Sequence, residues 1–273
     1  MKSKRLGRAA AALAFVAALA APLAASAHRQ WMLPSMTVLS GNDPWVTVDA
    51  AVSNDLFVFE HVPMRLESLV ITGPDGAPVE AKNGHTGKYR SVFDIQLSKP
   101  GTYRIANVAD GLLVSYKVGG EQKRWRGTEA EMAAAIPADA TEVKKTHSMR
   151  RVETFVTAGA PNDTALKATG KGLELVPVTH PNDLFAGEAA TFGLLIDGKP
   201  AADVEVTVAR GGARYLDDRG EMKIKTGADG KFTVTWPQAG FFWIEASVRG
   251  GPSAIAGAER SALYVATFEV LKE

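Results

Sequence analysis

Most of the chain alternates between short runs rich in β-branched or aromatic residues and clusters of glycine, proline, asparagine and aspartate. In the first half such runs occupy residues 45–52, 68–72, 91–97 and 103–106, and a turn signal at residues 73–76 separates two of them. Strands of this length, with turns at this spacing, are typical of antiparallel β-sandwiches. The first half is therefore expected to fold as a β-sandwich.

The second half repeats this pattern over residues 191–196, 204–208, 231–236 and 241–246. The dipeptide Asp197-Gly198 is a strong signal for a two-residue hairpin turn. The order of strands and turns suits a small immunoglobulin-like or carboxypeptidase-regulatory-like sandwich. The fold class is therefore predicted to be all-β, with two β-sandwich domains.

Helical periodicity is confined to residues 119–140. Thr128 can cap a helix there, Glu131 completes a capping box, and Pro137 ends the helix. We expect one short helix inside a connection. A polar stretch near Gly172 suggests a boundary between domains at residues 28–172 and 173–273.

The first 27 residues have the three-part pattern of a secretory signal peptide. Four basic residues precede an uncharged alanine- and leucine-rich run over residues 9–24, and Ala25-Ser26-Ala27 forms a cleavage site. A transmembrane anchor is the alternative, but the apolar run is short for a bilayer. We expect cleavage after Ala27, a periplasmic location, a mature chain that starts at His28, and no membrane insertion after cleavage.

Composition narrows the chemistry of this mature chain. Of 31 basic and 30 acidic residues, four basic ones lie in the signal peptide, which leaves a near-neutral protein. Such a balance gives no electrostatic footprint for nucleic acid or anionic lipid. The chain has no cysteine, so disulfides and thiolate ligands are excluded. A metal ion would have to be held by imidazole, carboxylate, amine or thioether groups.

His28 is the most informative of the five histidines. Cleavage after Ala27 would give it a free α-amine, which can close a chelate ring on one metal ion together with the imidazole Nδ1. One further imidazole would complete a histidine brace, a three-nitrogen site suited to copper or nickel. The alternative is that cleavage happens to precede a polar residue with no such role.

His61 is a candidate for the further imidazole because it follows an apolar run and precedes a proline-bounded loop. Glu60 and Met64 offer oxygen and sulfur nearby. A solvated loop histidine is the competing interpretation.

Two more histidines are candidate ligands. His147 lies in a basic stretch just before an expected strand at residues 152–157, where an anion site or plain solvation is equally compatible. His180 lies near Asp183 at the start of the second domain, and it could instead be a hinge residue packed at a domain interface. His85 lies in a glycine-rich turn and is expected to be exposed.

Catalytic signatures are missing from the sequence. It contains no Gly-x-Ser-x-Gly elbow, no glycine-rich phosphate loop and no metalloprotease helix, so no enzymatic activity is predicted. The five tryptophans could line a sugar platform, but Trp236 and Trp243 lie in expected strands and are predicted to fill the second core.

The start of the mature chain, His-x-x-Trp-x-x-Pro with His28, Trp31 and Pro34, resembles that of periplasmic proteins in domain-of-unknown-function family 4198. The segments at residues 181–184, 197–200, 228–232 and 239–243 extend this resemblance over nearly all of the mature chain. The resemblance implies a periplasmic protein associated with nickel or cobalt uptake, near metal transporters or outer-membrane receptors. It supports His28 as a ligand, with Trp31 and Pro34 holding the N-terminal strand.

The leading hypothesis is therefore a periplasmic binding protein for a divalent transition metal, nickel or cobalt first and copper second. His28 would be its central ligand, and His61, His147 and His180 are the other candidates. The alternatives are a non-metal envelope module that recognises peptide or glycan, and a histidine-brace copper oxidase.

Overall fold

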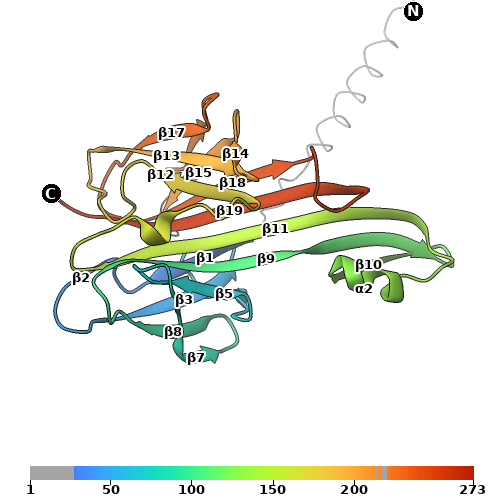
Figure 1. The fold of residues 1–273 in the computed structure, drawn as a ribbon, viewed down its shortest axis with the longest axis horizontal. Helices are drawn as coiled ribbons and strands as arrows, with labels where there is room; N and C mark the ends of the chain where they lie inside the picture. The colour runs from blue at the N-terminus through green and yellow to red at the C-terminus, as the bar shows by residue number, and fades with distance from the viewer. Residues whose placement is uncertain (1–27, 213, 215, 217–219) are drawn as a thin grey trace, which may run out of the picture.

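The computed structural model describes residues 28–212, 214, 216 and 220–273, which form three β-sheets (Figure 1). The all-β prediction is confirmed, and the expected signal peptide and its cleavage point lie outside the described residues. The largest sheet runs through the middle of the molecule, and each of the two smaller sheets covers a part of one of its faces.

The central sheet has ten strands among the described residues, and eight of them form a continuous path. In spatial order these eight are β16 (Met222–Lys225), β15 (Glu205–Arg210), β18 (Gly240–Arg249), β19 (Ala258–Val270), β11 (Thr141–Ala158), β9 (Gly101–Val118), β5 (Leu69–Thr72) and β6 (Pro78–Val79). The other two are β10 (Glu121–Gly127), which pairs with β9, and β2 (Val38–Leu39), which pairs with β11.

The two outer sheets come from different halves of the chain. The N-terminal outer sheet contains β1 (Arg29–Pro34), β3 (Trp45–Ser53), β4 (Val62–Pro63), β7 (Lys82–Thr86) and β8 (Ser91–Gln96). The C-terminal outer sheet contains β12 (Leu173–Pro177), β13 (Ala189–Ile196), β14 (Lys199–Pro200) and β17 (Lys231–Thr235). One turn of 3₁₀-helix (Thr164–Leu166) lies between β11 and β12.

Side chains alternate between the two faces of the central strands and so contribute to both hydrophobic cores. On β19, Tyr264 and Phe268 point to the core beneath the C-terminal outer sheet, whereas Val265 points to the core beneath the N-terminal outer sheet. On β11, Phe155 and Val156 divide between the two cores in the same way. Because successive strand side chains face opposite ways, a strand that is apolar on both faces belongs between two layers.

Trp236 and Trp243 are both fully buried, as expected, but they do not share a core. Trp236 packs in the C-terminal core, whereas Trp243 lies on the other face of the central sheet and packs in the N-terminal core. The prediction that Trp243 fills the second core is wrong. Side chains alternate between the two faces of β18, so Trp243 lies on the opposite face from Phe242 and Ile244, which pack in the C-terminal core.

The boundary expected near Gly172 falls between β11 and β12, but the central sheet continues across it. Strand β19 pairs in parallel with β11 over ten residues, from Lys145 opposite Ala258 to Thr154 opposite Thr267. The two halves are thus joined by backbone hydrogen bonds in one sheet. The Asp197-Gly198 turn forms the expected hairpin between β13 and β14, with both residues at positive φ.

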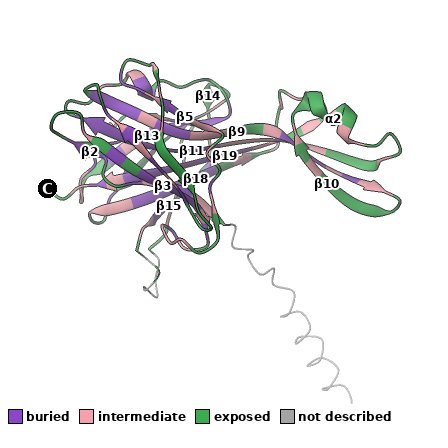
Figure 2. Cartoon of the chain, turned by 90° about the horizontal axis from the view of Figure 1, so that it is seen from below, coloured by how far each residue is buried: buried purple, intermediate pink, exposed green. Residues whose placement is uncertain are grey.

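Strands β9 and β11 extend beyond the layered body and form, with β10 and the helix α2 (Glu129–Ala135), a projection that we call the arm (residues 109–150) (Figure 2). The helix and its capping box are confirmed: the Glu131 carboxylate accepts hydrogen bonds from the Thr128 backbone and hydroxyl at 2.8 and 2.9 Å. A small core around Leu112 and Val114 covers one face of the arm. In the described part of the chain, no helix combines the length and apolar character needed to cross a membrane.

Candidate histidine site at the N-terminal strand

The imidazoles of His28 and His61 lie against each other at the start of β1. Their ring centroids are 3.9 Å apart and their planes differ by 2°. Both residues are exposed to solvent. Two imidazoles that are 33 positions apart in sequence are thus brought into contact by the fold, at the position that the sequence singled out.

Strand β3 explains this meeting. On one side it pairs with β1, where Arg29 lies opposite Ser53, and on the other side with β4, where Val62 lies opposite Val52. His28 immediately precedes β1 and His61 immediately precedes β4. The two histidines therefore flank the C-terminal end of the same strand, and their side chains meet beside it.

Trp31 fixes the N-terminal strand beneath this pair. Its side chain is fully buried, and its Nε1–H donates a hydrogen bond to Ser53 Oγ over 2.7 Å. The Ser53 hydroxyl donates in turn to the carbonyl of Asp55 over 2.6 Å. The Trp31 ring also contacts Phe57 and Phe59, with centroids 5.4 and 5.5 Å away. One tryptophan thus ties β1 to the loop that leads to His61.

Pro34 is buried at the other end of β1, opposite Val48. Residues of the C-terminal half hold the strand as well. Trp243 Nε1–H donates to the Gln30 carbonyl over 2.9 Å, and the Arg29 guanidinium lies over the Trp243 ring and forms an ion pair with Glu221. The start of the strand is therefore fastened from both sides.

Glu60 and Met64, the oxygen and sulfur options near His61, are engaged elsewhere. The Glu60 carboxylate accepts hydrogen bonds from the Asn54 backbone N–H, the Asn54 amide at 3.1 Å and the Asp55 N–H at 3.4 Å. These bonds, that of the Asn54 backbone first, hold the pKa of Glu60 below its usual value. Met64 is buried in the N-terminal core. Glu60 closes the loop that presents His61.

The structure does not bring His147 to this pair. His147 lies within β11, which begins at Thr141, much earlier than the strand expected at residues 152–157. Its ring is buried; Nε2 donates to Asp110 Oδ1 over 2.6 Å, and Nδ1 lies 3.2 Å from Ser253 Oγ. Both ring nitrogens are thus used within the protein.

His180 is also apart from the pair and has both nitrogens engaged. Nδ1 accepts the Asn182 N–H over 3.2 Å, so Nε2 carries the proton and donates to Thr102 Oγ1 over 3.0 Å. Burial lowers the pKa of His180 below its usual value. Thr102 and Asn182 belong to different halves of the chain, so this histidine joins β9 to the turn before β13. His85 is exposed on β7.

The donor set around His28 suits a nitrogen-preferring ion only in part. Among the described residues no group of three or more histidine, aspartate or glutamate side chains is arranged to hold a metal ion. Two imidazoles are present, and a third nitrogen would have to be the α-amine of a chain that begins at His28. A metal ion lies about 2.0–2.1 Å from each imidazole nitrogen and in the ring plane, so the parallel rings would have to turn toward each other.

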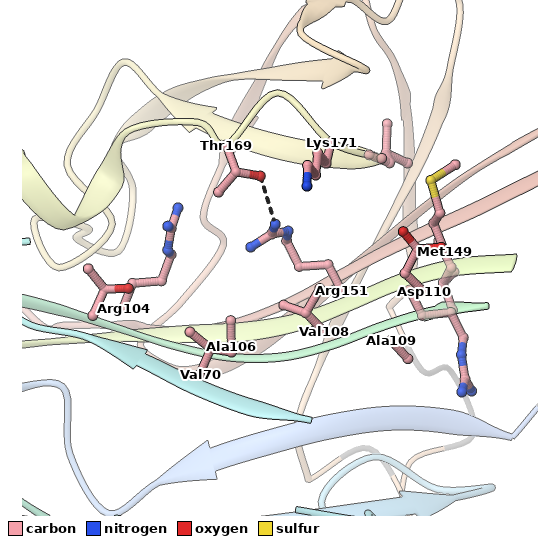
Figure 3. A pocket seen from close by; sticks show the side chains of 15 residues that line it. Val70, Arg104, Ala106, Val108, Ala109, Asp110, Met149, Arg151, Thr169 and Lys171 are labelled. Atoms are coloured by element: carbon pink, nitrogen blue, oxygen red, sulfur yellow. Dashed lines mark hydrogen bonds between the residues drawn. The ribbon is translucent and has the colours of Figure 1, made fainter. Parts of the chain in front are cut away.

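Sequence reasoning did not anticipate a pocket of about 310 Å³ between the central sheet and the segment before β12 (Figure 3). Arg104 and Arg151 rise from β9 and β11 toward Thr169 and Lys171. The Arg151 guanidinium donates to Thr169 Oγ1 over 3.2 Å. These four residues come from β9, β11 and the segment before β12. Sequence spacing alone therefore does not indicate that they meet.

Two buried glutamates compensate the positive charge of Arg151 in this pocket. Arg151 lies 3.5 Å from Glu153 and 3.2 Å from Glu174. Burial raises the pKa of Glu153, against the opposing effect of Arg151. Burial acts in the same direction on Glu174, but hydrogen bonds from Thr169 and the charge of Arg151 outweigh it and lower the pKa of Glu174. Arg151 is therefore neutralised within the fold, and no ligand is needed to balance its charge.

Comparisons with solved structures give only distant similarities. The D0-D1 domain of intimin is 13% identical, with 87% of this chain and 96% of that chain covered at a TM-score of 0.22. The human OSCAR ligand-binding domain is 12% identical, with 90% and 100% covered at a TM-score of 0.20. A marsupial T cell receptor is 9% identical, with 90% and 73% covered at a TM-score of 0.22. These similarities are too low to support a functional argument.

No curated protein matches the sequence. A family model does match, over residues 25–250, and it is described as a domain of unknown function. This match includes His28, Trp31, Pro34 and His61, and it extends through β18. The chain belongs to the family described as Domain of unknown function (DUF4198).

Proposed function

We propose that this protein binds a divalent transition metal ion through His28 and His61, with nickel or cobalt as the first candidates and copper as the alternative. The observation that supports the proposal is the contact between the two rings, 3.9 Å apart at the exposed start of β1. Neither imidazole is buried, so both can turn toward an ion. In this proposal the protein is not an enzyme.

The third nitrogen is proposed to be the α-amine of His28, exposed by cleavage after Ala27 in the periplasm. A residue that supplies an amine and an imidazole together forms a chelate ring, and His61 adds the second imidazole. Trp31, Ser53 and Glu60 keep the two histidines in place, as a pre-organised site requires. His147 and His180 are left out of this ligand set because both ring nitrogens of each already have partners.

A role in metal uptake, beside a transporter or an outer-membrane receptor, follows as a proposal from the family resemblance of the N-terminal motif. Peptide or glycan recognition gains no comparable support, because three of the five tryptophans, Trp31, Trp236 and Trp243, are buried and are not free to form a platform, whereas Trp45 is exposed.

Calorimetric titration of a chain that begins at His28, with Ni²⁺, Co²⁺ and Cu²⁺ in turn, tests the proposal. We expect one ion per chain, and a loss of affinity of roughly tenfold or more, equivalent to ~1.4 kcal/mol, in both His28→Ala and His61→Ala. His85→Ala, an exposed histidine on β7, is the matched control and should bind as the parent does.

A second preparation that retains Ala27 isolates the amine, because the added residue turns it into an amide while both imidazoles remain. It should bind as weakly as His28→Ala. Unchanged affinity in His61→Ala would exclude the paired site, and unchanged affinity in the extended chain would exclude the α-amine as a ligand.

A further inference from the structure

The arm has one apolar face that is packed and one face that is open and basic. Because side chains alternate along a strand, Ala109, Gly111 and Leu113 of β9 point away from the small core that contains Leu112 and Val114. On β11, Ser148 and Arg150 lie opposite Gly111 and Ala109. On β10, Arg126 lies opposite Leu113. All six residues therefore share the open face.

These six residues, which we call the arm cradle (Ala109, Gly111, Leu113, Arg126, Ser148 and Arg150), line a pocket of about 230 Å³ together with Asp110, Gly127 and Thr128. Its middle strand contributes two small residues, and Gly111 has no side chain. Arg126 and Arg150 stand on the two flanking strands, diagonally across Gly111. The result is a depression with small residues in its middle, flanked by the two strands that carry Arg126 and Arg150, and Asp110 is the acidic residue in its lining.

The two arginines have no counter-charge within the described residues. Neither side chain forms an ion pair or a hydrogen bond with another described residue, and the same is true of the Ser148 hydroxyl. Two acids of the arm are engaged by other groups: Asp110, which also lines the pocket, accepts a hydrogen bond from His147 at 2.6 Å, and Glu131 accepts one from Thr128 at 2.8 Å. Arg151, the next residue along β11, is by contrast balanced by two glutamates.

Arg150 is also partly removed from water. Burial, and after it the positive charge of Arg126, lowers the pKa of Arg150. Two like charges placed near each other, one of them half-buried, destabilise a fold unless an anion compensates them. Because the whole chain is near neutral, its overall composition does not indicate this local excess of positive charge.

We propose that the arm cradle binds a phosphomonoester group between Arg126 and Arg150. Two planar guanidiniums match the oxygens of a doubly charged tetrahedral anion in number and in charge. Ser148 supplies a hydroxyl donor, and the bare Gly111 floor leaves room for the anion. A single carboxylate would leave one guanidinium uncompensated, which is why phosphate is favoured over an acidic side chain.

The basic surface continues past the cradle. Arg126 also lines a second hollow of about 490 Å³, together with Arg124 and Lys144 on the same face. Neither Arg124 nor Lys144 forms an ion pair among the described residues. These extra charges favour a phosphate attached to a larger anionic surface, although the cradle by itself has the chemistry to hold inorganic phosphate. The two sources share one recognition chemistry and are separated by experiment.

The test titrates the whole mature protein with inorganic phosphate by calorimetry. It also measures binding to phosphatidylcholine vesicles that contain phosphatidic acid, a phosphomonoester headgroup. Vesicles with phosphatidylglycerol at equal surface charge are the phosphodiester comparison. We expect Arg126→Gln and Arg150→Gln to weaken binding by roughly tenfold or more. Arg249→Gln, which removes an exposed charge from β18, should leave binding unchanged.

Gly111→Ala separates a shaped site from general attraction. It keeps every charge, but the added methyl group fills the floor and lies 3.2 Å from the Gly127 carbonyl. We expect binding to fall with an unchanged circular dichroism spectrum. Loss of phosphate binding in these variants supports a site for free phosphate, and loss confined to phosphatidic acid vesicles supports a headgroup site.

Three outcomes would overturn the proposal. The first is the absence of binding in both assays. The second is equal binding of phosphatidic acid and phosphatidylglycerol, which would indicate attraction to charge alone. The third is binding by the two arginine variants at parental affinity. None of these three outcomes bears on the proposed metal site at His28 and His61, which is tested separately by the metal titrations.

Discussion

Two fully buried tryptophans offer a controlled measurement of what one indole hydrogen bond contributes to this fold. Trp31 in the N-terminal core donates to Ser53 Oγ over 2.7 Å. Trp236 in the C-terminal core is equally buried, but its Nε1–H has no partner among the described residues. The same substitution, tryptophan to phenylalanine, removes a satisfied donor from one site and an unsatisfied donor from the other.

The packing loss is similar at both sites. The smaller ring loses about 1 kcal/mol of apolar transfer free energy. A residual cavity of roughly 40 Å³ costs about 1 kcal/mol more. Trp31→Phe also loses a hydrogen bond that contributes ~1 kcal/mol, so its free energy of unfolding should fall by about 3 kcal/mol. Trp236→Phe relieves a buried unsatisfied donor worth ~1–3 kcal/mol, which offsets most of its packing loss.

Urea unfolding followed by far-ultraviolet circular dichroism measures both values, since tryptophan fluorescence changes with the substitutions themselves. We expect Trp31→Phe to be the less stable variant by about 2–4 kcal/mol, with equal slopes against urea. Equal destabilisation of the two variants would show that the Trp31–Ser53 bond adds nothing net to the fold. The anchoring role assigned to Trp31 beneath the histidine pair would then have to be given up.

Three further predictions concern the loop, the buried histidine and the shared sheet. The pKa of Glu60 is lowered in the fold, so its hydrogen bonds to the Asn54 and Asp55 amides should be fully present above its ordinary pKa of 4.5 and lost as the pH falls through the lowered pKa of the folded protein. Amide proton exchange at these residues should show this loss, and Glu60→Gln should abolish the pH dependence. His147→Leu removes the hydrogen bond to the exposed Asp110 carboxylate and should lower the free energy of unfolding by ~0.5–1.5 kcal/mol. Metal titrations should stay unchanged, and altered metal affinity would contradict the exclusion of His147 from the site. A chain that ends at residue 172 loses β18 and β19 and should give a poorly dispersed amide NMR spectrum, and a well-dispersed spectrum would show that the first half folds alone.

The sequence identified those elements whose pattern is local. The strands at residues 45–52, 91–97, 191–196 and 231–236 agree with β3, β8, β13 and β17 to within two residues, and the capped helix at Thr128 is as expected. Each of these elements is short and is bounded by its own turn or cap. Alternation and capping are properties of neighbouring residues, so they can be recognised without knowledge of the partner strands.

The long strands could not be recognised in this way. Strand β11 extends from Thr141 to Ala158, but its first ten residues include Lys144, Lys145 and Arg150 because they belong to the exposed arm. Strand β9 continues through the polar segment around Asp110 for the same reason. The parallel pairing of β11 with β19 joins residues more than a hundred positions apart. Charged residues at these positions indicate that the strand is exposed to solvent, and they do not exclude a strand.

The candidate site shows the same division between local and long-range information. His28 could be identified by its position after an expected cleavage site, but its meeting with His61 depends on β3 lying between β1 and β4. Conversely, basic neighbours gave no indication that His147 would be buried, because Asp110 reaches it from β9 and Ser253 reaches it from the loop between β18 and β19. Candidate ligands were therefore reduced from four to two by pairings that only the fold supplies.

The shared sheet also makes the histidine pair dependent on the whole chain. The strand that follows His28 is held by Trp243 through the Gln30 carbonyl and by Glu221 through Arg29, and both partners come from the C-terminal half. Trp243 can reach β1 only because β18 and β19 extend the central sheet beneath the N-terminal core. Substitutions in β18 should therefore be felt at His28, and the second half of the chain is a structural part of the site although it contributes no ligand.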